Sequence, residues 1–284
     1  MKDKIYRFFS LSVEYGFYGL LFFLPISIAL VESCAVLMLF GFIGRKSIKP
    51  DFKYLKFWPN IFLLLFLLFS AISLFNSGNY FSKSLNALFG KWAQYLGICI
   101  IIQDILSDQK IFKRCILVFL FGASLAVFSG LSQFFFGLEF LRHRSLVITD
   151  MGLRAITSSF THYNGFGAYL VVVMSLLLTL VTLPKLSRLR TYGLIILTML
   201  SIIAIFLTFS RGSWLALVVS FILLVILSSS NFKRLVPILL LVIALFLLPV
   251  FRDLYYLFFV KGYFLFLKKE GIAIGLDIGW LRGR

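Results

Sequence analysis

Acidic residues are scarce in this chain of 284 residues, which has 11 Asp and Glu against 28 Lys and Arg. Charged residues of both signs make up only 14% of the sequence, whereas hydrophobic residues make up 61%. The mean hydropathy is +1.02. The surface of a soluble domain needs more polar side chains than this sequence supplies. The composition therefore excludes a soluble globular protein.

Residues that bind metals or form disulfides are also few. The only histidines are His143 and His162, and the three cysteines are Cys34, Cys99 and Cys115. The cysteines lie within apolar segments at unrelated spacings, which is typical of small packing residues rather than of metal ligands or a disulfide framework. The sequence predicts neither a metal site nor a cofactor.

Apolar segments of membrane-spanning length recur along the whole chain, and the strict alternation of a membrane β-barrel is absent. These features predict an all-α polytopic integral membrane protein with about nine transmembrane helices. The predicted spans are 8–24, 26–44, 57–75, 91–106, 115–136, 163–183, 192–209, 213–229 and 235–250. Only Pro25 separates the first two, so one long kinked helix is the alternative there. Since linkers, low-complexity tracts and internal repeats are absent, we expect a single integral-membrane domain over 1–284.

The distribution of Lys and Arg predicts the orientation of the spans. The N-terminus is basic and lacks a small-residue cleavage site, which favours a retained first span over a signal peptide. With the N-terminus in the cytoplasm, the cytoplasmic connectors contain most of the cations. These are Lys2, Lys4, Arg7, Arg45, Lys46, Lys49, Lys53, Lys56, Lys110, Lys113, Arg114, Lys185, Arg188, Arg190, Lys233 and Arg234. Topology and anionic lipid headgroups thus account for most of the net charge of +17, and nucleic acid is not an expected partner.

Few cations remain in the predicted outer connectors before the tail, and most of those are arginines. They are Lys83, Lys91, Arg142, Arg144, Arg154 and Arg211. A charge that opposes the positive-inside trend needs another explanation, and arginine favours bidentate contact with phosphate or carboxylate. The alternative is ordinary loop solvation, which we weigh most heavily for Arg142 and Arg144.

The longest predicted connector before the tail is the outer loop 137–163. It is rich in hydroxyl, amide and imidazole groups, and we expect Thr161 or Asn164 to cap the helix that follows. Its only carboxylates, Glu139 and Asp150, do not form an Asp-x-Asp pair, so a metal site has no support here.

A second polar feature is the Ser-Arg-Gly turn at 210–212, between two apolar runs. Gly212 is expected to allow a sharp reversal, Ser210 and Ser213 to cap the helix ends, and Trp214 to lie at the membrane interface. An arginine at such a turn is costly near hydrocarbon and suggests a functional site. We expect Arg211 to hold an anionic lipid-linked group, with a headgroup-seeking helix-end anchor as the alternative.

Two further features remain ambiguous. The acids Glu32 and Asp104 lie near predicted helix ends, where an interfacial position is more common than an ion path. The tail 251–284 is aromatic and basic and ends without a clear stop, so it is either incomplete or interfacial. A tenth span in the tail is disfavoured because it would bury Arg252, Asp253 and Lys261.

The segment 208–217, Thr-Phe-Ser-Arg-Gly-Ser-Trp-Leu-Ala-Leu, resembles the signature of the O-antigen ligase and polymerase superfamily. A second match begins at Arg154 and continues through Thr161-His162-Tyr163-Asn164 to residue 169, with Tyr163 where the family has Pro. The segment 22–30 is also similar to the first spans of these proteins. The resemblance covers roughly 15–250.

This resemblance implies a GT-C-like helical bundle and a metal-independent glycosyltransferase at the outer face of the bacterial inner (plasma) membrane. The implied donor is a glycan on undecaprenyl diphosphate. The acceptor is a lipid A core hydroxyl for a ligase, or a second lipid-linked glycan for a polymerase. Arg154 and Arg211 would hold the donor diphosphate and act in catalysis. Five further residues would contact substrate, namely His162, Asn164, Ser210, Arg142 and Arg144.

One departure from the family concerns the general base. Family members have a catalytic His in a large loop after the last outer segment, whereas both histidines here precede the turn at 210–212. The base is therefore not assigned, and we expect the chain to be a C-terminally truncated member, with loss of activity as one alternative. The alternatives are a polymerase, a flippase or transporter of lipid-linked glycans, and a non-catalytic fragment. Because the outer cations lie at one face and not at the membrane midplane, transport is disfavoured.

Overall fold

The computed structural model describes residues 2–50, 58–149, 153–182 and 187–227, with the isolated positions 238 and 242. The protein is 82% helical, as expected for an all-α membrane protein. The described ranges contain six helices that are long and apolar enough to cross a membrane, at Ile28–Ile48, Trp58–Asn76, Gly78–Ile105, Gln109–Phe136, Tyr163–Thr182 and Arg188–Leu207. The count of about nine spans and the GT-C-like arrangement stay predictions.

Contacts between Cα atoms divide the chain into two compact units, unit 1 (Met1–Phe128) and unit 2 (Ser129–Arg284). Each unit is described separately below. The prediction of a single integral domain stays a prediction.

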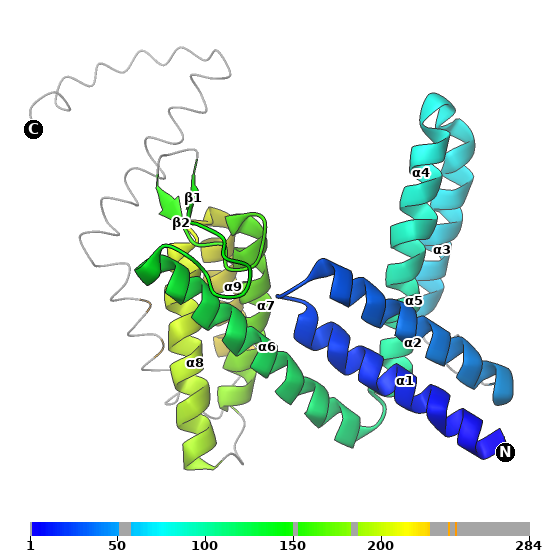
Figure 1. The fold of residues 1–284 in the computed structure, drawn as a ribbon, viewed down its shortest axis with the longest axis horizontal. Coiled ribbons are helices and arrows are strands. Elements are labelled where there is room, and N and C mark those ends of the chain that lie inside the picture. The colour runs from blue at the N-terminus through cyan, green and yellow to red at the C-terminus, as the bar shows by residue number, and fades with distance from the viewer. Residues whose placement is uncertain are drawn as a thin grey trace, which may run out of the picture. The chain divides into compact units, whose positions relative to one another are not determined.

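Unit 1 begins with an antiparallel helix pair, α1 (Lys2–Phe23) and α2 (Ile28–Ile48), which lie side by side in Figure 1. A turn at Pro25 separates them, so the two-helix prediction is confirmed over one kinked helix. Glycines allow the helices to approach closely. A Cβ atom added to Gly41 would lie 2.9 Å from the carbonyl oxygen of Phe9, and one added to Gly16 would lie 2.8 Å from Met38 Cγ. Small residues at contacts of this kind are typical of membrane helix packing.

The next two spans form a second helix pair. The first consists of α3 (Trp58–Ser73) and the short 3₁₀ segment η2 (Leu74–Asn76). The second consists of η3 (Gly78–Tyr80), α4 (Phe81–Ala87), the π-helical segment η4 (Leu88–Trp92) and α5 (Ala93–Ile105). The prediction that this span begins at residue 91 is wrong, because helical structure begins at Gly78. The chain turns at Ser77 and Gly78, where Gly78 has φ +49°, and residues 81–92 contain no proline to stop a helix.

Polar side chains join the helices of unit 1. The side-chain amides of Asn60 and Gln103 exchange two hydrogen bonds of 2.7 and 2.8 Å between α3 and α5. One residue further along α5, Asp104 forms ion pairs with Arg45 and Lys46 at the end of α2, the latter at 3.3 Å. Asp104 is thus near a helix end, as predicted from the sequence.

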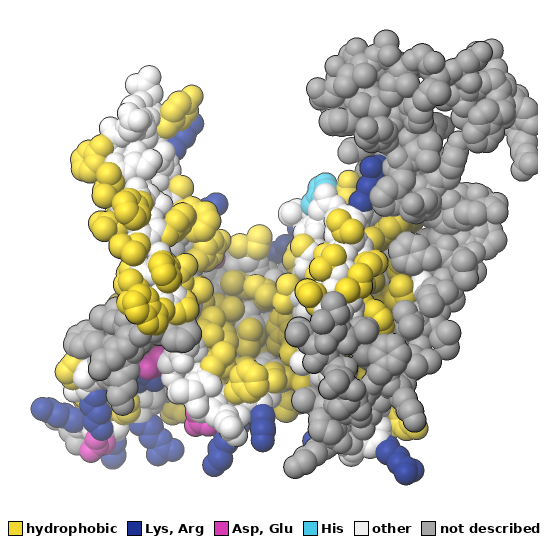
Figure 2. Space-filling model, turned by 180° about the vertical axis from the view of Figure 1, so that it is seen from behind, with side chains coloured by type: hydrophobic (Ala, Val, Ile, Leu, Met, Phe, Trp, Pro, Cys, Tyr) yellow, Lys and Arg dark blue, Asp and Glu magenta, His cyan; other side chains and the backbone are white. Residues whose placement is uncertain are grey.

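Many of the basic side chains of unit 1 lie at one end of the unit, together with acidic side chains, and a few lie elsewhere on it (Figure 2). Lys49 at the end of α2 pairs with Asp3 at the start of α1 at 3.5 Å, and Arg114 near the start of α6 (Gln109–Phe136) pairs with Glu14 at 3.2 Å. The charged ends of α1, α2, α5 and α6 are therefore brought together. If the spans alternate in direction as predicted, these four helix ends lie on the same side of the membrane.

Unit 2 contains the last turns of α6, a small hairpin and three helices. The hairpin pairs β1 (Val147–Ile148) with β2 (Arg154–Ala155), and the helices are α7 (Tyr163–Thr182), α8 (Arg188–Leu207) and α9 (Arg211–Leu227). The predicted spans at 115–136, 163–183, 192–209 and 213–229 each correspond to a helix. The predicted span 235–250, apart from positions 238 and 242, and the tail 251–284 lie outside the described residues.

Helices α7 and α9 run in the same direction. Gly167 lies against Ser213, and seven residues further along α9 the hydroxyl of Ser220 lies 3.4 Å from that of Ser175 on α7. Their apolar faces form the core of unit 2 with α8. The largest fully buried side chains of these helices are Phe166, Leu170, Met174, Leu177, Leu178, Ile202, Ile205 and Phe206. Because α8 runs in the opposite direction, its last residues meet the first residues of α7 and α9.

Candidate anion-binding site

The predicted site residues that the structure describes lie at one end of unit 2, where α7 and α9 begin, α8 ends and the β1–β2 hairpin lies (Figure 1). Two contacts join the matched segments there. The backbone N–H of Ile156 donates a hydrogen bond of 3.1 Å to the carbonyl oxygen of Leu207. A Cβ atom added to Gly167 would lie 2.3 Å from Ser213 Oγ. The segment that contains Arg154 and the turn that precedes Arg211 are therefore in direct contact.

The reversal between α8 and α9 differs from the prediction. It occurs at Thr208–Phe209–Ser210, and Arg211 and Gly212 already belong to the first turn of α9. The left-handed residue is Phe209, with φ +51°, whereas Gly212 needs no unusual backbone conformation. Thr208 Oγ1 supports the turn, because it donates to the carbonyl oxygen of Ile205 at 2.6 Å and accepts from the N–H of Ser210 at 3.3 Å.

Trp214 packs inside the protein, and its position at the membrane interface stays a prediction. The side chain is only 5% exposed, and its Nε1–H donates to the carbonyl oxygen of Ile205 at 3.2 Å. Its ring packs on Phe206 with 5.1 Å between centroids. Ser210 and Ser213 are buried too, and the hydroxyl of Ser213 donates to that of Ser210 at 2.9 Å. These residues therefore fix the shape of the turn beneath α7.

Arg211 is the first residue of α9 and is half-buried. Unsatisfied N–H groups give a helix N-terminus a partial positive charge, so an arginine there adds a full charge where an anion is already favoured. Arg154 is exposed in β2, opposite Ile148. It lies two residues before Ile156, which contacts the end of α8. Both arginines thus belong to the same end of unit 2.

The loop between α6 and β1 is organised around the buried carboxylate of Glu139, which sequence reasoning considered only as a metal ligand. It accepts hydrogen bonds from Ser129 Oγ at 2.7 Å and from the backbone N–H groups of Leu141 at 2.7 Å, Arg142 at 2.6 Å and Arg144 at 3.4 Å. A fully buried carboxylate needs such donors, because desolvation of an unpaired charge is costly. Glu139 is therefore a structural anchor of the loop.

Gln133, one helical turn after Ser129, connects this loop to the segment after Arg154. Its Nε2 donates to the carbonyl oxygen of Ser145 at 2.8 Å, and its Oε1 accepts from the N–H groups of Thr157 at 2.7 Å and Ser158 at 2.9 Å. Sequence reasoning missed this buried residue. The sequence did contain a signal, because Ser129 and Gln133 are polar residues four positions apart near the end of an apolar helix.

The arginine side chains of the loop have no carboxylate partner within the described residues. None of the ion pairs found there involves Arg142, Arg144 or Arg154. Glu139 is the one described carboxylate of the loop, and it is occupied by backbone N–H groups. Asp150 lies outside the described residues. Figure 2 shows a histidine and basic side chains together at this end of unit 2. The arrangement suits an anionic ligand.

His162 provides the cap of α7, whereas the sequence favoured Thr161 or Asn164. Its Nδ1 accepts the backbone N–H of Asn164 at 3.2 Å, and its carbonyl oxygen accepts those of Gly165 and Phe166 at 3.0 and 3.2 Å. An imidazole that accepts at Nδ1 has its proton on Nε2. In this state the exposed ring is a hydrogen-bond donor towards an anion rather than a base. The side chain of Asn164 is exposed beside it.

The substitution His162→Asn separates capping from ligand binding. Asparagine is a good N-cap residue, so the thermal unfolding midpoint in detergent should stay within about 2 °C of wild type. Asparagine lacks the imidazole Nε2–H, so binding of inorganic pyrophosphate should weaken about three- to tenfold. Calorimetry of the purified full chain measures both quantities. Unchanged binding would limit His162 to its capping role.

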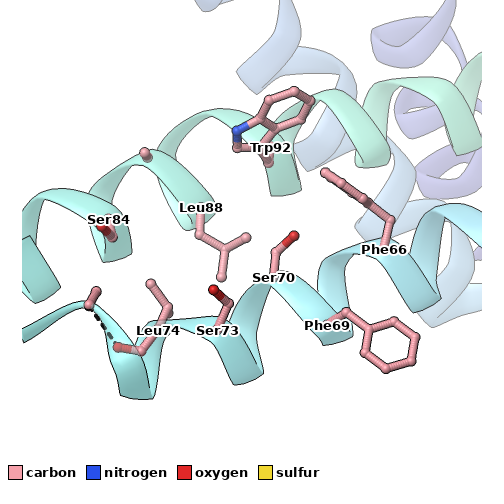
Figure 3. A pocket seen from close by; sticks show the side chains of 10 residues that line it. Phe66, Phe69, Ser70, Ser73, Leu74, Ser84, Leu88 and Trp92 are labelled. Atoms are coloured by element: carbon pink, nitrogen blue, oxygen red, sulfur yellow. Dashed lines mark hydrogen bonds between the residues drawn. The ribbon is translucent and has the colours of Figure 1, made fainter.

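A separate groove of about 480 Å³ lies in unit 1, between α3 and the α4–η4 segment (Figure 3). Serine hydroxyls and the rings of Phe66 and Trp92 line it, and Ser77 Oγ donates to the carbonyl oxygen of Leu74 at 2.7 Å. The residues that line it have no charge, so this groove cannot neutralise a phosphate. None of the predicted site residues lies there.

Cation-binding clusters are absent from the described ranges, which contain no group of three His, Cys, Asp or Glu side chains that could hold a metal ion. The positive groups at the candidate site are guanidinium groups and helix N-termini. Comparisons with protein-family models, with curated proteins and with solved structures find no match for this chain. The chemistry of the site's own residues is therefore the basis for its assignment.

Proposed function

We propose that this protein is a membrane glycosyltransferase of the O-antigen ligase type, which transfers a glycan from undecaprenyl diphosphate to a lipid A core hydroxyl. One observation carries the proposal. The segments that contain Arg154 and Arg211 contact each other at the end of unit 2 where α7 and α9 begin. A diphosphate is the kind of ligand that fixed guanidinium groups and helix N-termini bind best.

The proposed reaction explains why the protein needs two arginines. The acceptor oxygen attacks the anomeric carbon of the donor, and the bond from that carbon to the diphosphate oxygen breaks. The bonding electrons leave with the diphosphate, which gains negative charge, and the acceptor hydroxyl loses its proton. Arg154 and Arg211 would stabilise the developing charge from fixed positions without a metal ion. Preorganised donors of this type contribute about 3 kcal/mol each to lowering a barrier.

The remaining predicted residues take supporting roles in this proposal. His162 donates its Nε2–H to a diphosphate oxygen, and Arg142, Arg144 and Asn164 contact the phosphate or the glycan. Ser210 acts through the shape of the turn, because its hydroxyl is buried and accepts a bond from Ser213. The general base for the acceptor hydroxyl is not assigned to any residue.

The proposal includes a location at the outer face of the bacterial inner membrane, with the N-terminus in the cytoplasm. The gathering of charged helix ends in unit 1 supports it, because Lys and Arg concentrate on the cytoplasmic side of membrane proteins. The arginines of unit 2 that the structure describes lie at helix ends and in loops, which favours transfer at a membrane surface over transport through a midplane site.

An assay with the full chain in liposomes separates the candidate functions. The liposomes contain a donor glycan on undecaprenyl diphosphate and a lipid A core acceptor, and the products are followed by gel electrophoresis and mass spectrometry. We expect glycan on the lipid A core together with released undecaprenyl diphosphate. Longer lipid-linked glycans without lipid A product would indicate the polymerase. Movement of intact donor across the bilayer without any new glycosidic bond would indicate the flippase and contradict the proposal.

A further inference from the structure

We propose that Glu139 is a positioning residue, whose buried carboxylate sets the turn 140–145 so that Arg142 and Arg144 are presented to a phosphate-containing ligand. The identity of that ligand as a diphosphate rests on the function proposed above. The positioning role itself depends only on the hydrogen bonds and burial of the loop.

The carboxylate of Glu139 is the centre around which the turn closes. Three backbone N–H groups, from Leu141, Arg142 and Arg144, converge on its two oxygens. The N–H of Glu139 in turn donates to the carbonyl oxygen of Arg144 at 3.1 Å, and His143 takes the left-handed conformation with φ +55°. Without an acceptor at their centre, the converging N–H groups would lose these partners in a partly buried turn.

The use of backbone donors has a consequence for the arginine side chains. A carboxylate beside two guanidinium groups would ordinarily pair with them and cancel their charge. Here the lone pairs of Glu139 accept N–H and hydroxyl groups instead, and no ion pair within the described residues involves Arg142 or Arg144. Arg142 is exposed and Arg144 half-buried. The turn therefore offers two cations, two residues apart, to a ligand from outside.

Helix α6 connects this turn to the segment that contains Arg154. Ser129 holds Glu139 at 2.7 Å, and Gln133, on the same face of α6, bonds both to the carbonyl oxygen of Ser145 and to the N–H groups of Thr157 and Ser158. Two side chains of one rigid helix thus fix both cationic segments. Fixed positions are what a multidentate phosphate site requires, because each loosely held cation loses entropy when the ligand binds.

The test is whether Glu139→Gln strengthens or weakens the binding of an anion. This substitution removes a negative charge close to the arginines, so electrostatics alone predicts tighter anion binding. Positioning predicts weaker binding, because a glutamine amide cannot accept all of the converging N–H groups. The probe is inorganic pyrophosphate, titrated calorimetrically into the purified full chain in detergent at fixed ionic strength. We expect the dissociation constant to rise at least about tenfold.

Three further variants complete the experiment. The double variant Arg142→Ala/Arg144→Ala should weaken pyrophosphate binding at least as much as Glu139→Gln, because it removes both cations that the turn presents. Glu32→Gln, which removes an exposed acid on α2, should leave the affinity unchanged or slightly tighter. Ser129→Ala keeps the charge of Glu139 and removes one of its donors, so it should weaken binding about threefold. It replaces Glu139→Gln as the deciding variant if the latter does not fold.

Equal or tighter binding by Glu139→Gln, or by Ser129→Ala where that variant decides, would overturn the positioning role. A wild-type protein that does not bind pyrophosphate would overturn it too, whatever its transferase activity. A wild-type protein that binds pyrophosphate, loses binding in Glu139→Gln and transfers no glycan would support the positioning role and contradict the proposed function. The two proposals can therefore fail separately.

Discussion

Arg211→Ala is expected to slow glycan transfer about a hundredfold, because on the proposed function it removes one of the two cations that stabilise the departing diphosphate. The effect should appear in kcat at saturating donor, since the negative charge on the leaving group develops only as the bond breaks. Arg154→Ala should give a loss of the same order, and the double variant should lose less than the product of the two. The measurement is the initial rate of lipid A core glycosylation in liposomes.

Two variants control this prediction. Arg190→Ala removes an exposed arginine at the opposite end of α8, so it should transfer glycan at the wild-type rate within about twofold. Arg211→Lys keeps the charge and loses the planar fork, so its rate should lie between those of Arg211→Ala and wild type. Equal losses in Arg190→Ala and Arg211→Ala would show a general effect of surface charge. A wild-type rate in Arg211→Ala would contradict the assignment.

Gly167→Ala is expected to destabilise unit 2 by about 1–3 kcal/mol, because the added methyl group enters a contact without free space. An added Cβ would lie 2.3 Å from Ser213 Oγ, 3.1 Å from Ser213 Cβ and 3.2 Å from Ser210 Cβ. The helix N-termini of α7 and α9 would then have to separate, so glycan transfer should fall together with stability. The thermal unfolding midpoint in detergent measures the first effect and the liposome assay the second.

Gly212→Ala is the matched control, five residues after the end of α8 and two before Trp214. It lies in the first turn of α9, and an added Cβ would meet no atom within 4 Å. Alanine favours a helix over glycine by up to about 1 kcal/mol, so stability should stay equal or rise. If Gly212→Ala lowers the midpoint as much as Gly167→Ala, the reversal depends on Gly212 after all, and our description of the turn is wrong.

Hydropathy and proline predicted the helices of the described ranges well, except in one region. The break at Pro25 and the helices of 115–136, 163–183, 192–209 and 213–229 follow from apolar length and flanking charge. The start of the fourth span was misplaced, because the polar and aromatic residues 78–90 have the composition of a connector. Their backbone forms 3₁₀, α and π segments in series behind the turn at Gly78.

For the candidate site, the charge pattern indicated which segments to consider but not their geometry. The arginines were found because they oppose the charge trend of the chain. The conformations of Phe209 and the burial of Trp214 could not be predicted, since an aromatic residue at a helix end suits both an interface and a core. In the structure Trp214 packs on Phe206 and donates to the carbonyl oxygen of Ile205, contacts that depend on how α9 folds back on α8. The anchoring role of Glu139 was missed because three of its four hydrogen-bond partners are backbone groups, which a sequence does not display.

The π-helical segment Leu88–Trp92 has a geometric consequence for unit 1. A π turn contains about one residue more than an α turn, which rotates everything after it by about 100° relative to an uninterrupted helix. The helical run from α4 through η4 to α5 therefore has two buried faces that point in different directions. Ser84 and Leu88 face the groove beside α3, whereas Ile101 and Ile105 face the core formed with α1 and α2. Deletion of a single residue between 88 and 92 would bring the two faces into line. The helix could then keep its contacts with α3 or those with α1 and α2, but not both.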